Sequence, residues 1–337
     1  MIPGISLEGY DALRRHAGLI DRAEYARIAV YGKDRASYLH GLLTNEIASL
    51  QAGQGCYAAY LTPQGRMIAD MWVYELGDVI ILTVLRDVKD TVLDKLDQFV
   101  FSEDVQLGDV TDTFAAVGLL GPHAAAILSR ALDADEAALA ALPEHGNLRA
   151  SFNREAAIVL RVTDHGEPGY DVLVQAPMCP LLREALLDGG AADVDAATAE
   201  TVRIESGVPR FHRDMDEATI PLEAGIEGRA ISLTKGCYVG QEVIIRVLHR
   251  GHGRVARKLV GLVFVDDPAD GSGDTTQVEH REIGRVTSAA WSPALQRTIA
   301  LAYVQRDFTS PGTPVRVGGR PASVVALPFT SKPPSTI

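Results

Sequence analysis

Residues 56–85 read CYAAYLTPQGRMIADMWVYELGDVIILTVL and contain many β-branched and aromatic residues, which favour strands. A turn at Gln64 and Gly65 and a break at Gly77 and Asp78 divide this stretch into short segments. Neighbouring strands joined by such short turns pair in the antiparallel direction. The stretch therefore predicts a hairpin or meander of consecutive antiparallel strands.

Amphipathic segments flank this predicted meander on both sides. Before it, Asp34 can cap a helix that ends near Leu50. One face of that helix carries the apolar residues Tyr38, Leu39, Leu42 and Leu43. After the meander, apolar residues recur at helical spacing at Val88, Val92, Leu96 and Phe99. The pattern predicts one helix on each side of the first sheet.

Strands and helices alternate again farther along the chain. The predicted strands are 114–120, 156–162 and 170–174, the last two joined by a turn at 164–169. The predicted helices are an Ala-rich segment that begins at Pro122, 180–188, and 196–206 after the cap residue Asp195. From Gly207 to Gly240 few apolar residues are periodic. Irregular segments of this length inside a compact domain usually serve a function.

After Leu259 the pattern changes to short strands separated by Gly, Pro and Asp. The predicted strands are 259–265, 283–290, 299–303, 315–317 and 322–326. A small all-β barrel fits them best. The sequence therefore predicts an α+β protein with an N-terminal region over residues 1–250 and a C-terminal β-barrel domain over residues 251–337.

The charge balance limits the possible partners. The chain has 337 residues, with 32 Lys and Arg against 44 Asp and Glu, so its net charge is −12. Negative charge opposes unspecific binding to phosphate backbones and anionic membranes. The longest aliphatic runs, 79–85 and 259–265, are too short to cross a bilayer, and charges at Glu8 and Asp11 interrupt any secretory signal. We expect a cytoplasmic protein that binds a small ligand or another protein, and neither nucleic acid nor a membrane.

The three cysteines, Cys56, Cys179 and Cys237, are widely spaced in the sequence. No Cys-x-x-Cys pair occurs, so neither a disulfide framework nor a self-contained zinc or iron–sulfur site is indicated. The histidines show no metal-binding spacing either. We therefore expect no metal site.

The strongest local signal is the octet KGCYVGQE, residues 235–242. A nearby cation lowers the pKa of a thiol, so Lys235, together with Arg246, can make Cys237 nucleophilic. In extended backbone, Lys235 and Cys237 lie on the same face. The alternative is that Cys237 is a small buried hydrophobic residue and that the glycines serve a turn.

Three further features each have a functional and a structural interpretation. In GEPGYD, residues 166–171, a turn can present Glu167 to the edge of a planar heterocycle, or it is a solvated hairpin turn. Arg203 and Glu205 near a helix end can contribute to a site or only pair with each other. Residues 246–258 are basic without any acidic residue, and this segment can hold a polyanionic ligand tail or an acidic protein, or form a solvated face.

Together these motifs resemble the YgfZ family of folate-binding proteins of iron–sulfur cluster assembly. That family is itself similar to the T-protein, the aminomethyltransferase of the glycine cleavage system. The resemblance covers nearly the whole chain, and it is carried by residues 39–46 (LHGLLTNE), 166–171, 203–207 (RIESG), 221–223 (PLE) and 235–242. The octet is the most specific of these motifs, because true T-proteins lack its cysteine.

The resemblance implies a three-domain cloverleaf as in the T-protein. Two intertwined α+β domains in the N-terminal region would bind tetrahydrofolate, and the C-terminal barrel would be the third domain. The candidate catalytic residues are Cys237, Lys235 and Asp70. The candidate folate-binding residues are Glu167, Tyr170, Asn45, Arg203, Glu242 and Arg246.

One position departs from the T-protein pattern. T-proteins carry an Asp-Asp pair after a glycine turn, and the corresponding residues here are Ala69 and Asp70. A carboxylate at this place handles a proton or stabilises a cationic iminium, and alanine does neither. Three functions remain open. The chain is a tetrahydrofolate-binding protein that assists iron–sulfur client or assembly proteins through Cys237, an aminomethyltransferase that uses Asp70, or a folate-binding module without catalysis.

Overall fold

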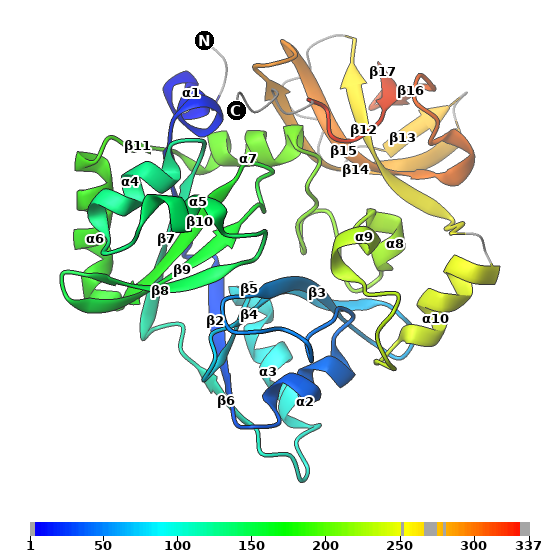
Figure 1. The fold of residues 1–337 in the computed structure, drawn as a ribbon. Coiled ribbons are helices and arrows are strands. Elements are labelled where there is room, and N and C mark those ends of the chain that lie inside the picture. The colour runs from blue at the N-terminus through cyan, green and yellow to red at the C-terminus, as the bar shows by residue number, and fades with distance from the viewer. Residues whose placement is uncertain (1–3, 251–252, 266–274, 279–280, 331–337) are drawn as a thin grey trace.

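Three β-structures organise the chain, and each forms a lobe of its own in Figure 1. In the computed structural model, which describes residues 4–250, 253–265, 275–278 and 281–330, two of them are open sheets and the third is a closed barrel. This arrangement confirms the α+β class, the three lobes of the cloverleaf and the C-terminal barrel. The division at residues 250 and 251 stays a prediction.

The first sheet contains the predicted meander. Its strand order is β3-β4-β5-β2-β6, and all neighbouring strands are antiparallel. The strands are β2 (Tyr25–Tyr31), β3 (Gly55–Leu61), β4 (Met67–Glu75), β5 (Ile80–Leu85) and β6 (Gln106–Asp109). The helices of this lobe are α2 (Arg35–Leu42), η1 (Arg86–Val88) and α3 (Lys89–Asp97). Gly65 has a φ of 73° in the β3–β4 turn, which glycine adopts without steric cost.

Helix α2 ends at Leu42, well before the predicted end at Leu50. The hydroxyl of Thr44 donates to the carbonyl of Ala230 at 2.6 Å, which holds the chain away from the helical path. The carboxylate of Asp34 accepts a backbone N–H from the loop before β6 and makes no capping bond to α2. Both differences arise from contacts between segments that are far apart in the sequence.

The second sheet has the order β11-β1-β7-β10-β9-β8, in which the β11–β1 pair alone is parallel. Its strands are β1 (Gly18–Asp21), β7 (Phe114–Leu120), β8 (Asn147–Phe152), β9 (Glu155–Val162), β10 (Gly169–Gln175) and β11 (Ala192–Asp193). The helices of this lobe are α1 (Leu7–Arg15), α4 (Ala124–Ala131), α5 (Glu136–Ala141), η2 (Ala176–Met178), α6 (Cys179–Asp188) and α7 (Ala196–Glu205). Strand β1 belongs to this sheet although β2, which follows it directly, belongs to the first. The chain therefore passes between the two sheets near its N-terminus.

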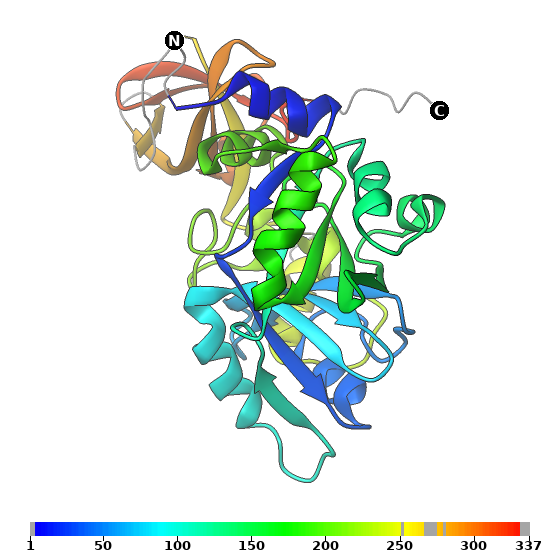
Figure 2. The same cartoon turned by 90° about the vertical axis from the view of Figure 1, so that its left-hand side faces the viewer.

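The barrel closes in the order β12-β15-β14-β13-β16-β17. Its elements are β12 (Arg257–Phe264), β13 (Thr275–Val278), β14 (Arg281–Ser292), β15 (Arg297–Gln305), η4 (Arg306–Phe308), β16 (Pro314–Val317) and β17 (Arg320–Val325). The barrel was predicted with one strand fewer, because β13 is short and polar. Figure 2 shows the barrel at the top of the molecule and the first sheet at the bottom.

The segment predicted to be irregular lies between the three lobes in Figure 1. It contains the short helices α8 (Pro221–Ala224) and α9 (Glu227–Ala230), and it leads into α10 (Gln241–Ile245) and the π-helical η3 (Arg246–Arg250). Its apolar residues Phe211, Leu222 and Ile226 belong to the same buried cluster as the first sheet. Burial of these side chains explains how a segment without regular periodicity keeps a defined path.

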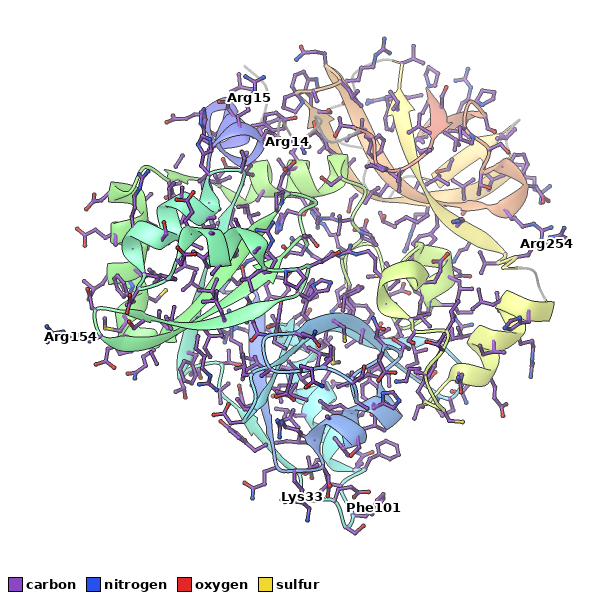
Figure 3. The ribbon with its side chains drawn as sticks, in the orientation of Figure 1. Arg14, Arg15, Lys33, Phe101, Arg154 and Arg254 are labelled. Carbon is purple, nitrogen blue, oxygen red and sulfur yellow. The ribbon has the colours of Figure 1, made fainter. Side chains whose placement is uncertain are left out.

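A partly buried ion-pair network joins α1 to other elements of the second lobe and reaches the barrel. The guanidinium of Arg14 donates to the carboxylates of Glu167 in the second lobe and Glu205 on α7. Glu205 also accepts a hydrogen bond from Ser292 of the barrel. Figure 3 shows Arg14 beside its exposed neighbour Arg15 on α1. One arginine therefore connects the turn before β10, helix α7 and, through Glu205, the barrel.

Candidate functional site

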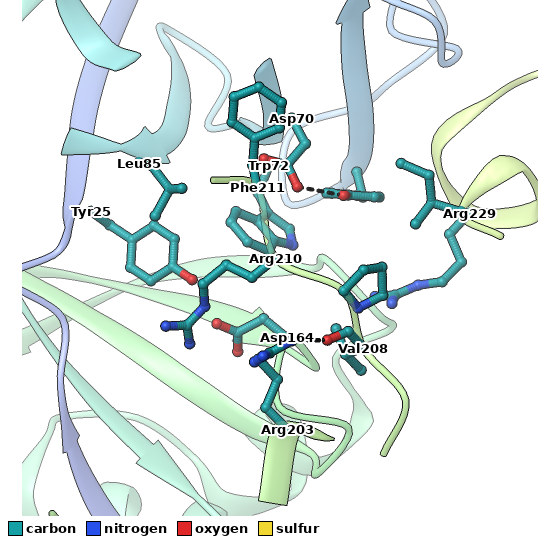
Figure 4. Close-up of a pocket in the computed structure, with 13 residues that line it drawn as sticks. Tyr25, Asp70, Trp72, Leu85, Asp164, Arg203, Val208, Arg210, Phe211 and Arg229 are labelled. Carbon is teal, nitrogen blue, oxygen red and sulfur yellow. Dashed lines mark hydrogen bonds between the residues drawn. The ribbon is translucent and has the colours of Figure 1, made fainter. Parts of the chain in front are cut away.

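A pocket lies where the two sheets meet the segment between α7 and α9. Aromatic rings contribute much of its wall. The aromatic lining residues are Tyr25, Tyr57, Trp72 and Phe211, and the charged ones are Asp70, Asp164, Arg203, Arg210 and Arg229. Figure 4 shows Asp70, Trp72 and Phe211 at one end and Asp164 and Arg203 at the other. An aromatic pocket with a few charged groups suits a flat, polar ligand.

Strand alternation on the β3–β4 hairpin positions the carboxylate of Asp70. Tyr57 lies opposite Trp72 and Ala59 lies opposite Asp70, so Tyr57, Trp72 and Asp70 share one face of the sheet. Ala69 points to the other face and is fully buried in the apolar core. Of the two positions that correspond to the Asp-Asp pair of T-proteins, only that of Asp70 therefore faces the pocket.

Asp70 is buried, with 7% of its surface exposed. The Tyr57 hydroxyl donates to its Oδ2 at 2.6 Å, the bond drawn as a dashed line in Figure 4. Burial raises the pKa of Asp70 above its ordinary value, and the hydrogen bond from Tyr57 opposes that rise by favouring the ionised form. The carboxyl group is thus suited to take up and release a proton.

The three arginines of the pocket differ in how far their charge is already neutralised. Arg203 is fully buried and is bonded to Glu200 at 2.6 Å and to Asp214 at 2.7 Å. Arg210 pairs with Glu24 at 3.1 Å and lies 3.8 Å from Glu200. Arg203 therefore holds the segment between α7 and α9 in place, and its charge is not available to a ligand.

Arg229 has a more exposed guanidinium than Arg203. Its Nη2 donates to Glu144 at 3.1 Å and to the hydroxyl of Thr163 at 3.2 Å. The guanidinium also lies 5.6 Å from the centre of the Tyr57 ring. Arg229 thereby places a cation close to the tyrosine that binds Asp70.

The indole of Trp72 carries an unused hydrogen-bond donor. Its ring packs against Tyr25 and Tyr57, each with ring centres 5.5 Å apart. The indole nitrogen is buried and has no hydrogen-bond partner among the residues that the structure describes. Leaving a buried donor unpaired is costly, so this atom is expected to meet a ligand or a water.

The predicted turn at 164–169 contributes to the pocket through a residue that the prediction missed. Asp164, at the start of the predicted turn, lines the pocket and is bound by Arg22, which holds the pKa of Asp164 well below its usual range. Glu167 pairs with Arg14, and the Tyr170 hydroxyl donates to the carbonyl of Leu139 at 2.9 Å. Neither Glu167 nor Tyr170 lines the pocket, and their contact with folate stays a prediction.

The octet lies outside the pocket. Its Lys235 ammonium donates to three backbone carbonyls near the end of α2, those of His40, Leu43 and Asn45. The thiol of Cys237 is exposed. The alternative that Cys237 is a buried hydrophobic residue is therefore wrong. The glycine part of that interpretation holds at Gly240, whose φ of 86° favours glycine.

The remaining predicted ligand residues lie around the octet. Asn45 donates from Nδ2 to the carbonyls of Tyr57 and Arg229, at 2.8 and 2.9 Å. Glu242 and Arg246 are exposed on α10 and η3 and do not line the pocket. Of the predicted site residues, the pocket thus contains Asp70 and Arg203, with Asn45 directly behind it.

The pocket contains residues that were not predicted, most of them for lack of a local signal. Trp72 and Tyr57 could have been found, because they share the strand face of Asp70 within the predicted meander. Arg210, Phe211 and Arg229 lie in the segment without periodicity, where nothing in the sequence distinguishes a lining residue from its neighbours.

Two kinds of feature are absent from the part of the chain that the structure describes. No group of three or more His, Cys, Asp or Glu residues in these ranges could hold a metal ion. In the same ranges, no helix is both long and apolar enough to cross a bilayer.

The fold and pocket define a three-lobed protein with an aromatic pocket that contains the buried carboxylates of Asp70 and Asp164. Residues 4–235 match the model of the GCVT N-terminal domain, and residues 257–330 match that of the glycine cleavage T-protein C-terminal barrel domain. The chain belongs to this glycine cleavage T-protein family. Proteins of the family bind tetrahydrofolate, as the resemblance implied.

Individual relatives agree with the family assignment. An aminomethyltransferase of Rubrobacter xylanophilus is 32% identical over 328 residues, which cover 97% of this chain and 86% of that protein. A putative chloroplastic transferase of Arabidopsis thaliana is 29% identical over 332 residues, covering 97% and 75%. The crystal structure of the glycine cleavage system aminomethyltransferase T from Bartonella henselae is similar with a TM-score of 0.87 at 24% identity, covering 97% of this chain and 90% of that one.

Proposed function

We propose that this protein binds a tetrahydrofolate in the pocket around Asp70 and acts in the transfer of a one-carbon unit, as an aminomethyltransferase does. The single observation that carries the proposal is the buried Asp70 carboxylate, bonded to Tyr57 on an aromatic pocket wall. A tetrahydrofolate supplies the nitrogen atoms that carry one-carbon units. The names of the relatives support the same reaction class.

The residues present fit such a ligand. The rings of Tyr57, Trp72 and Phe211 provide flat apolar surfaces for an aromatic heterocycle. The unpaired indole N–H of Trp72 provides a donor for one of its polar atoms. Arg229 provides a cation for an anionic group, since it is only partly neutralised by Glu144.

Asp70 is the residue assigned to the chemistry. A carboxyl group with a raised pKa accepts or gives up a proton nearer to neutral pH than an ordinary one. In its ionised form it stabilises positive charge that develops on the one-carbon unit. The Tyr57 hydroxyl donates to Oδ2 of this carboxylate.

Replacing Asp70 by Asn tests this proposal. Asn keeps the shape and the hydrogen bond to Tyr57 but carries no charge and takes up no proton. We expect tetrahydrofolate to bind, while folate-dependent release of ammonia from an aminomethylated carrier protein falls about a hundredfold or more. The exposed Asp78, replaced by Asn, is the control and should keep the wild-type rate. A wild-type rate in Asp70→Asn would show that this carboxylate is not used.

A second candidate function rests on the octet. Lys235 and Gly240 hold the segment on both sides of Cys237, and the thiol is left exposed. This supports the narrower resemblance to the YgfZ family, in which the protein assists iron–sulfur client or assembly proteins. The exposed thiol would act on a partner, since Cys237 does not line the pocket.

Complementation separates the two candidates. In a host that lacks the gene, the activity of an iron–sulfur enzyme should be restored by the wild type and by Cys179→Ala, and not by Cys237→Ala, if the second candidate holds. Cys179 is the control because its thiol is a partly buried group on α6. Restoration by Cys237→Ala equal to wild type would exclude a role of this thiol in maturation and leave aminomethyl transfer.

A further inference from the structure

The side chain of Lys235 occupies an unusual environment for a cation. It is 8% exposed, and its Nζ donates to the carbonyls of His40 at 2.6 Å, Leu43 at 2.6 Å and Asn45 at 2.8 Å. An ammonium has three protons, so all of them are used. The acceptors come from the last turn of α2 and the residues after it, where a helix leaves carbonyls without partners. A lysine suits that place because the helix dipole is negative there.

The third of these carbonyls belongs to a residue that contacts the pocket wall. The side-chain amide of Asn45 donates to the carbonyl of Tyr57 at 2.8 Å and to that of Arg229 at 2.9 Å. Tyr57 and Arg229 both line the pocket, and Tyr57 binds Asp70. Lys235 is therefore bonded to the backbone of Asn45, and the Asn45 side chain to the backbone of Tyr57, whose hydroxyl binds Asp70.

We propose that Lys235 is a positioning residue of the ligand pocket, which fixes Asn45 so that Asn45 holds Tyr57 and Arg229 in place for the ligand. This role rests on the proposed binding of tetrahydrofolate. It differs from activation of the thiol, because the ammonium is committed to carbonyl groups and Cys237 projects to the surface. The lysine and the cysteine of the octet thus serve different parts of the protein.

The pH dependence of binding provides a readout specific to the ammonium. Burial lowers the pKa of Lys235 to about 8. The other titratable groups that face it are His40 from α2, Glu46 from the following loop, Cys56 from β3 and the Tyr238 ring. The pKa of His40 is lowered by burial, and burial raises those of Cys56 and Tyr238 to about 12. Above roughly pH 8 the amine has lost one donor, so affinity should fall as the pH rises through this range.

The experiment measures the affinity of the full chain for 5-formyltetrahydrofolate by titration calorimetry. The variants are Lys235→Met, Asn45→Ala, the double variant, and Lys33→Met as a matched control at an exposed lysine. We expect each of the first two to weaken binding about tenfold. The double variant should bind no more weakly than the weaker single one, because the two residues act in series. Lys33→Met should bind as the wild type does, and the fall in affinity near pH 8 should vanish in Lys235→Met.

The results of this experiment either support or contradict the positioning role of Lys235. Wild-type affinity in a folded Lys235→Met, or additive losses in the double variant, would overturn the positioning role. If Lys235→Met does not fold, the pH profiles of wild type and Asn45→Ala decide instead: a fall that is lost in Asn45→Ala supports the role, and identical falls contradict it. If the wild type does not bind the probe, the proposed function itself is wrong. Equal binding by wild type and variants removes only the role of Lys235.

Discussion

At the scale of single residues, the surroundings of Asp70 shift its pKa. The strand register turns its carboxylate to the pocket and turns Ala69 into the core. Burial and the Tyr57 hydroxyl then act on its pKa in opposite directions. The balance between these two effects, more than the presence of a carboxylate, determines when Asp70 holds a proton.

Removal of the Tyr57 hydroxyl tests this balance. In Tyr57→Phe the bond that favours the ionised form is lost, so the pKa of Asp70 should rise further. We expect the acidic limb of the pH–rate profile for folate-dependent ammonia release to move to higher pH. Tyr60→Phe is the control, because Tyr60 is on the same strand but binds the carbonyl of Lys95 away from the pocket. An unmoved acidic limb in Tyr57→Phe would show that the hydroxyl does not influence Asp70.

At the scale of elements, the octet is a segment fastened at both ends. Lys235 caps the end of α2, and Gly240 packs against the turn between β3 and β4. Gly240 has a φ of 86°, and a Cβ there would lie 2.6 Å from the carbonyl oxygen of Thr62. Gly236, four residues earlier, has open space around its Cβ position. The two glycines of the octet therefore differ in how strictly they are required.

Replacing Gly240 and Gly236 by alanine, one at a time, gives a matched pair of variants. Gly240→Ala should lower the free energy of unfolding by about 2 kcal/mol, because alanine is strained at positive φ and the backbone contact must open. It should also change the rate at which Cys237 reacts with an alkylating reagent. Gly236→Ala should change stability by less than about 0.5 kcal/mol. Chemical denaturation measures the free energy of unfolding of both variants. Equal values for the two would contradict the packing of Gly240 against Thr62.

Local patterns predicted the elements well where periodicity is strong. The meander of β3, β4 and β5, the strands β7, β9 and β10, and the barrel follow from alternation and turn residues within a short stretch. Strand β8 was missed because its Asn, Arg, Ala and Ser are poor strand formers, and it is held by pairing with β9. The end of α2 was misplaced because a contact with Ala230 stops it. Such long-range contacts leave no periodic signal.

At the scale of the whole molecule, Arg14 joins elements of the second lobe and reaches the barrel through Glu205. It binds Glu167 and Glu205, and Glu205 reaches Ser292 of the barrel. Pairing of Arg203 with Glu205, one of the two interpretations of these residues, does not occur, since Arg203 binds Glu200 and Asp214 instead. The charged residues of this region thus join α1 to α7 and connect α7 to the barrel.

Two adjacent arginines test this network. Arg14→Met leaves two buried carboxylates without their cation and should lower the free energy of unfolding by about 3–5 kcal/mol at neutral pH. Arg15→Met removes an exposed pair with Asp11 and should cost less than about 0.5 kcal/mol. Urea denaturation of both variants provides the comparison. Similar losses in the two would mean that the ion pairs of Arg14 do not stabilise this junction.

The amino-acid sequence alone was enough to predict the α+β class, the barrel and the strand that carries Asp70. It also singled out the octet. Periodicity and turn residues act over a few positions, so they can be recognised locally. The partners of Lys235, the burial of Tyr170 and the entry of Arg229 and Phe211 into the pocket were decided by tertiary structure. Burial and hydrogen bonding depend on which distant segments meet, and those contacts determine which side chains remain free to bind a ligand.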